Sequence, residues 1–173
     1  GLNIVQAASL YNAHRIIAID IHKNRLDLAK KVGATNIILS DGTDSWQDEA
    51  KRIFPKGLFD LVIDNTGNTD IISLAYELTS QSGKTILVGV PKENDRASIY
   101  TLPIHFGKRL IGSHGGNGSP EVDINRYLNL EILGKFDTSI IVSDTGNLYD
   151  INFAIDKLVS GEASGRYIIN CRV

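Results

Sequence analysis

The sequence predicts an α/β protein built on a doubly wound parallel sheet, with helices crossing over between the strands. Short apolar runs typical of buried strands alternate with segments of helical periodicity along the whole chain. The 173 residues, 42% hydrophobic and 22% charged, suffice for one substantial core, and no internal repeat or linker interrupts them. We therefore predict a single domain over residues 1–173.

Each predicted element follows from its hydrophobic pattern. Helices are predicted over residues 2–11, 23–32, 44–53, 68–79, 121–133 and 148–160, with Gly33 and Gly161 as C-terminal caps. Strands are predicted over 15–20, 36–39, 59–64, 85–90, 109–113, 139–142 and 166–171, and 97–102 alternates as an edge strand would. The Gly-rich run 112–119 is interpreted as a loop, because the carboxylates that open the next helix would repel a phosphate.

Composition and charge exclude several classes of partner. The net charge of −2 and the scattered basic residues argue against nucleic-acid binding. No apolar run approaches the roughly 18 residues that cross a bilayer, and no secretory signal begins the chain, so a cytoplasmic protein is expected. The lone Cys171 excludes internal disulfides, and the four histidines lie at no metal-ligand spacing, so no metal site is predicted within the chain.

The first twenty residues indicate a dinucleotide site. Gly1 leads directly into a helix, and Asp20 ends the next strand about twenty positions later. This matches the end of a Gly-x-Gly-x-x-Gly turn followed by the acidic residue that binds an adenosine ribose, the Rossmann arrangement. We expect Gly1 to be the third glycine of that turn, with the first strand and the start of the turn upstream. Asp20 would repel a 2′-phosphate, so NAD is expected rather than NADP.

Four motifs resemble the medium-chain dehydrogenases, and most closely their zinc-type alcohol dehydrogenase branch. They occur in the family's order and span nearly the whole chain: residues 19–35, Phe59-Asp-Leu-Val-Ile-Asp-Asn-Thr-Gly67, Gly83-Lys-Thr-Ile-Leu-Val-Gly-Val-Pro91, and Ser160-Gly-Glu-Ala-Ser-Gly-Arg-Tyr-Ile-Ile169. The resemblance implies an NAD-dependent oxidoreductase that moves hydride between an alcohol or aldehyde and the cofactor. It also implies that zinc and the catalytic residues belong to a domain absent from this chain, so the chain alone should be inactive.

The resemblance also assigns candidate cofactor-binding residues. Asp20 would bind the ribose, Ile21 would contact the adenine, and Arg25 would lie near the ribose oxygens, although it also fits a solvated helix charge. The full set is Gly1, Leu2, Asp20, Ile21, Arg25, Thr66, Gly67, Val88, Gly89, Val90, His114 and Arg166.

Some of the remaining residues are assigned to the nicotinamide and the phosphates. Val88-Gly-Val90 would run beside the nicotinamide, where Gly89 lets the backbone approach the ring, and Arg166 would meet a phosphate with its forked donors. Gly67 also fits a simple turn, and His114 fits a turn better than a catalytic base.

Two other functions share these features. An NAD-sensing module without chemistry would need the same cofactor residues, and a methyltransferase could also use a carboxylate on an adenosine ribose. A short-chain dehydrogenase is disfavoured, because no tyrosine begins a Tyr-x-x-x-Lys motif. The resemblance further implies a homodimer that pairs through the segment 97–102.

Overall fold

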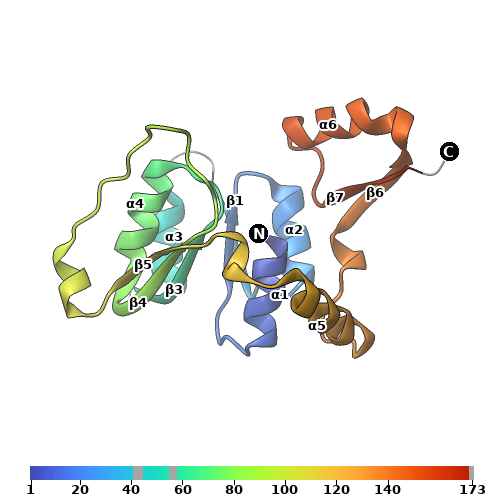
Figure 1. Cartoon of the computed structure of the whole chain (residues 1–173). Helices are drawn as coiled ribbons and strands as arrows, with labels where there is room; N and C mark the ends of the chain where they lie inside the picture. Colours follow the sequence, from blue (N-terminus) through green and yellow to red (C-terminus); the bar gives the residue numbers. More distant parts are fainter. Residues whose placement is uncertain (41–44, 55–57, 172–173) are drawn as a thin grey trace. The chain divides into compact units, whose positions relative to one another are not determined.

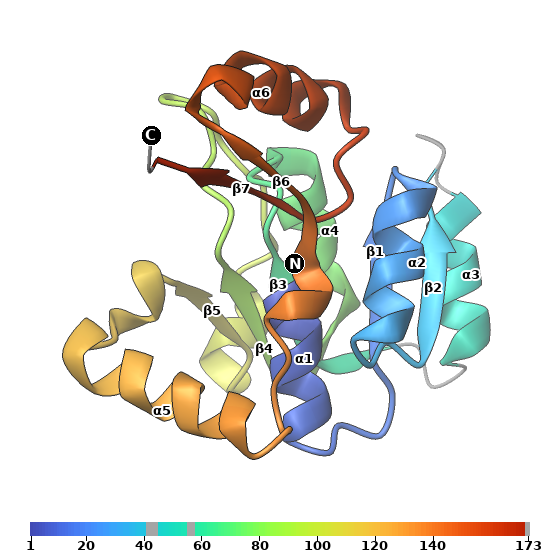
Figure 2. The same cartoon turned by 90° about the vertical axis from the view of Figure 1, so that its right-hand side faces the viewer.

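A computed structural model describes residues 1–40, 45–54 and 58–171 as helices, parallel strands and their connections (Figures 1 and 2). The chain divides into two compact units, one of residues 1–50 and 123–173 and the other of residues 51–122. Every strand pairing in the described residues is parallel, as the sequence predicts. The α/β class is therefore confirmed, whereas the single domain stays a prediction.

The first unit begins with helices and strands in strict alternation. These are α1 (Leu2–Leu10), β1 (Ile17–Asp20), α2 (Lys23–Lys31), β2 (Asn36–Leu39) and α3 (Ser45–Ile53), whose last three residues belong to the second unit. β1 pairs with β2, and α2 packs against both strands. The apolar face of α1 meets that of α2 in a core that contains Val5, Ile16, Ala29, Val32 and Ala34. The helical periodicity in the sequence thus places the same faces inside that the structure buries.

The rest of the first unit follows α5 (Pro120–Ile132), which begins in the second unit. After the 3₁₀ turn η3 (Ser139–Ile141) come β6 (Val142–Asn147), the 3₁₀ turn η4 (Leu148–Asp150), α6 (Ile151–Ser160) and β7 (Arg166–Asn170). β6 and β7 form a parallel pair. Gly161 ends α6 with φ of 79°, as the predicted cap requires.

The second unit holds β3 (Phe59–Asp64), α4 (Thr69–Leu78), β4 (Thr79–Leu87), η1 (Leu102–Phe106), β5 (Arg109–Gly112) and η2 (Gly115–Asn117). Its sheet has the order β3-β4-β5, and α4 packs against β3 and β4. The chain passes from α4 into β4 without a loop, and the buried hydroxyls of Thr79 and Thr85 hydrogen-bond at 2.7 Å. All three strands run the same way, so their carboxyl ends lie at one edge of this sheet.

Three predicted strands differ from the structure in kind or by more than two residues at one end. β4 covers Thr79–Leu87 rather than 85–90, because Thr79 already pairs with Phe59 ahead of a register shift and Asp64 captures the amides that follow Leu87. Residues 139–141 form a 3₁₀ turn, because Asp137 Oδ1 accepts hydrogen bonds from Ser139 and Ile140. Residues 97–101 are not a strand and 102 starts η1, because no neighbouring strand offers this segment a hydrogen-bond ladder within the described chain.

Candidate dinucleotide-binding site

The start of α1 lies near two charged residues from distant parts of the first unit. Gly1 is the N-cap, and its carbonyl accepts from the amides of Ile4 at 2.9 Å and Val5 at 3.1 Å. Burial and then the charge of Arg166 lower the pKa of the Gly1 amino group, whereas Asp20 raises it, so both side chains lie within electrostatic range. The first amides of a helix have no acceptors within it, and they favour an anion.

Leu2 contributes to this region through its backbone. Its side chain packs against the buried core of the first unit. The first-turn amide of Leu2 therefore remains the part of this residue that can meet a phosphate.

Asp20 ends β1 with its carboxylate oriented by the chain itself. Its Oδ1 accepts a hydrogen bond of 2.9 Å from the backbone amide of His22. No lysine or arginine of the described residues forms an ion pair with it. Its remaining lone pairs are free to accept from a diol, which is the chemistry of a ribose.

Ile21 and Arg25 flank Asp20 as predicted. Ile21 is 65% exposed, an unusual exposure for an isoleucine beside a strand, and Arg25 is half-buried in the first turn of α2. An apolar surface next to an oriented carboxylate suits an adenine base next to its ribose.

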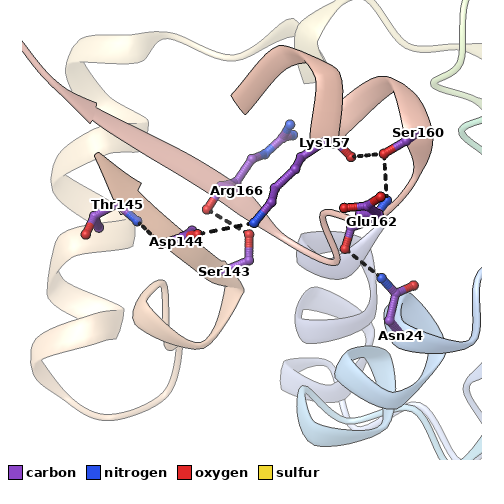
Figure 3. Close-up of polar contacts among 8 residues, drawn as sticks. All are labelled: Asn24, Ser143, Asp144, Thr145, Lys157, Ser160, Glu162 and Arg166. Carbon is purple, nitrogen blue, oxygen red and sulfur yellow. Dashed lines mark hydrogen bonds and ion pairs between the residues drawn. The ribbon is translucent and has the colours of Figure 1, made fainter. Parts of the chain in front are cut away.

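Arg166 is the first residue of β7, and a set of polar contacts holds the loop that precedes it (Figure 3). Asn24 Nδ2 donates to the carbonyl of Glu162 at 3.0 Å and to that of Gly161 at 3.4 Å. The imidazole of His22 packs against Gly161, where an added Cβ would lie 2.2 Å from His22 Cε1. The segment after Asp20 is thus attached to the segment before Arg166.

The carboxyl edge of the second unit is organised by Asp64, a residue that the sequence analysis did not single out. Asp64 is 3% exposed. Its Oδ1 accepts from the Thr66 hydroxyl at 2.6 Å and the Thr66 amide at 3.1 Å, and its Oδ2 accepts from the Gly67 amide at 3.1 Å. Its carbonyl accepts from the amides of Val88 and Gly89. The signal for this role was the run Asp64-Asn-Thr-Gly67, which is typical of an Asx turn.

Gly67 and Gly89 are required by the contact between these two loops. Gly67 has φ of 72°, and an added Cβ would lie 2.4 Å from the carbonyl oxygen of Val90. A Cβ on Gly89 would lie 2.3 Å from the amide nitrogen of Gly67. The packing of the loops therefore explains both glycines without a ligand. Val88 and Val90 remain 41% and 86% exposed beside them.

His114 follows β5 and begins the turn η2. The Ser113 amide donates to the Leu87 carbonyl at 2.8 Å and extends the pairing of β4 with β5. The side chain of His114 is exposed, and Gly115, Gly116 and Asn117 all have positive φ. A backbone contact to a ligand remains available here, and nothing marks the imidazole as a base.

The described residues contain no group of three or more His, Cys, Asp or Glu side chains placed to hold a metal ion. Within the same residues, no helix is both long and apolar enough to cross a membrane.

The parallel fold and the oriented carboxylate are typical of nucleotide-binding α/β proteins, and comparison with known proteins gives the family. A family model described as "Zinc-binding dehydrogenase" matches residues 1–130, and the chain belongs to this family. Alcohol dehydrogenase 2 of Zea mays is 27% identical over 164 residues, which cover 94% of this chain and 43% of the maize protein. The chain thus spans less than half the length of the curated relatives it matches.

Solved structures agree. Benzyl alcohol dehydrogenase from Acinetobacter calcoaceticus has a TM-score of 0.89 at 30% identity, covering 99% of this chain and 47% of that one. An alcohol dehydrogenase zinc-binding domain protein from Burkholderia ambifaria has a TM-score of 0.89 at 28% identity, covering 99% and 46%. These matches favour neither the methyltransferase nor the sensor alternative.

Asp64 gives a stability prediction that is independent of any ligand. Asp64→Asn replaces one carboxylate oxygen by an NH₂ group, which cannot accept the hydrogen bonds that this oxygen accepts now. We therefore expect the free energy of unfolding to fall by about 1–3 kcal/mol. Asp60→Asn, an exposed position on the same strand, should change it by less than about 0.5 kcal/mol. Denaturant unfolding measures both, and equal effects would show that the Asp64 contacts contribute no stability.

Proposed function

We propose that this chain is the NAD-binding part of a zinc-dependent alcohol dehydrogenase, in which hydride moves between an alcohol or aldehyde and the nicotinamide. The observation that carries the proposal is the Asp20 carboxylate, which is oriented by His22 and lies within electrostatic range of the start of α1, as Arg166 also does. Family membership supports the reaction class. The role of each cofactor residue is part of this proposal.

The residues of the first unit fit the adenosine diphosphate half of NAD. Asp20 would accept both ribose hydroxyls, and Ile21 would cover one face of the adenine. The amides that open α1 and the guanidinium of Arg166 would neutralise the diphosphate. Arg25, in the first turn of α2, would lie on the ribose side.

The second unit would serve the nicotinamide half. Thr66, Gly67 and the run Val88-Gly89-Val90 would form the wall against which the ring lies, and the backbone near His114 would hydrogen-bond its carboxamide. A zinc ion bound elsewhere in the protein would polarise the substrate oxygen. The described residues offer no such ligand group, so the rest of the protein would supply it.

Two further features belong to the same proposal. We place the protein in the cytoplasm, consistent with a single cysteine in the chain. We also propose a homodimer that pairs through residues 97–102, since Tyr100 of this segment and Ile104 of η1 are exposed apolar side chains. A segment that pairs only with its own copy across a two-fold axis has no hydrogen-bond ladder within a single chain. Residues 97–102 accordingly have no strand structure here.

The cofactor preference is tested at Asp20 in the full-length protein. Asp20→Asn keeps the acceptor for His22 but removes the charge, so the Kd for NAD should rise about 10- to 100-fold. The Kd for NADP should rise less or fall, because the repulsion of its 2′-phosphate is lost. Asp27→Asn, an exposed position on α2, is the control and should change neither. An unchanged ratio of the two constants would contradict the ribose role.

Asn24 should act on NAD binding only through Arg166. Asn24→Ala releases the loop before Arg166 and should raise the Kd for NAD about three- to tenfold. In an Arg166→Met background the same change should have little further effect, because the two residues share one pathway. Additive effects in the double variant would show that Asn24 does not position Arg166.

The dimer is tested by a charge at the proposed interface. Tyr100→Asp would bury an unpaired carboxylate in the dimer, so light scattering at micromolar concentration should show a monomer. Tyr149→Asp introduces the same charge at an exposed tyrosine of η4 and should leave the dimer intact. A monomeric unmodified protein would refute the proposal.

A further inference from the structure

A pocket of about 360 Å³ lies at the amino-terminal edge of the sheet β3-β4-β5, opposite the edge organised by Asp64. Its lining includes Leu58, which precedes β3, Thr79, which begins β4, and Lys108, which precedes β5. Leu102, Pro103 and Phe106 of η1 form an apolar wall. We call this cavity the Lys108 pocket.

Lys108 is a buried cation with no ion-pair partner among the residues that the structure describes. The residue is only 6% exposed, and its Nζ lies 4.1 Å from the centroid of the Tyr76 ring. The ion pairs found in the described part of the chain are Lys23 with Asp27 and Lys157 with Asp144, so Lys108 belongs to neither. A cation–π contact replaces only part of the hydration that an ammonium loses on burial.

The surroundings of Lys108 show the cost of this burial. Burial lowers the pKa of Lys108, and the carboxylate of Glu77 partly opposes the shift. Glu77 lines the same pocket and is exposed, and it lies beyond ion-pairing distance from Lys108. The phenol of Tyr76 is buried beneath the ammonium, and its hydroxyl has no hydrogen-bond partner in the described residues. An anion that reached the ammonium would stabilise this buried charge.

We propose that the Lys108 pocket binds a small monocarboxylate with an apolar body. The carboxylate would pair with the Lys108 ammonium, and the body would lie against Leu102, Pro103 and Phe106. The volume is that of a small-ligand site. A doubly charged phosphate fits less well, since a single cation faces it and Glu77 would repel the second charge. This proposal goes beyond the dehydrogenase function and does not depend on it.

Titration calorimetry with benzoate tests the site in the full-length protein. Benzoate should bind, whereas benzamide, a neutral molecule of the same shape, and inorganic phosphate should not. Lys108→Met keeps the length of the side chain and should raise the Kd for benzoate at least about tenfold. Lys92→Met makes the same change of charge at an exposed lysine of this unit and should leave the Kd unchanged.

Glu77→Gln provides a second variant at an exposed position. Removing the repulsion should lower the Kd for benzoate about two- to fivefold, with the Kd for NAD unchanged. The proposal is overturned if benzoate does not bind, if benzamide binds equally well, or if folded Lys108→Met binds benzoate as the unmodified protein does. If Lys108→Met does not fold, an unchanged benzoate Kd in Glu77→Gln overturns it.

Discussion

Asp64 ends β3 with its carboxylate buried, and both of its oxygens accept hydrogen bonds from the turn that follows. A charge removed from water is tolerated only when such donors replace the water, so the path of residues 65–67 is fixed by this side chain. The carbonyl of the same residue captures the amides of Val88 and Gly89 and ends the ladder of β4. One residue thus sets the separation of the two loops, and Gly67 and Gly89 follow from how closely they approach.

The sequence predicts the fold wherever hydrophobic periodicity decides it. The strands at 36–39 and 59–64 have the predicted bounds, and each has a helix packed against it, α2 on β2 and α4 on β3. The start of β4 was missed because Thr79 to Lys84 are mostly polar, and Thr79 pairs with Phe59 across a register shift from the rest of the strand. The alternation in 97–102 suggested a strand, but a strand also needs a partner, and none of the described residues pairs with this segment.

The candidate site was predictable where a residue acts through its own position in an element. Asp20 follows from its place at the end of a strand, and the electrostatic effect of both Asp20 and Arg166 on Gly1 agrees with that prediction. His22 and Asn24 were missed because their contacts are with Gly161 and Glu162, which are remote in sequence. For Gly89, close approach of a ligand was expected, whereas the structure shows close approach of the chain itself.

The buried and half-buried charges of this chain differ in how completely the chain satisfies them, and this difference separates structural roles from binding roles. The carboxylate of Asp64 accepts three hydrogen bonds from the chain and has little capacity left for a ligand. That of Asp20 accepts one such hydrogen bond and keeps further lone pairs for a ligand. Lys108 faces the Tyr76 ring and has no ion pair within the described residues, so its ammonium can still donate to a ligand. By this criterion Asp64 has a structural role at the carboxyl edge of its sheet, while Asp20 and Lys108 are the charges positioned to bind a ligand.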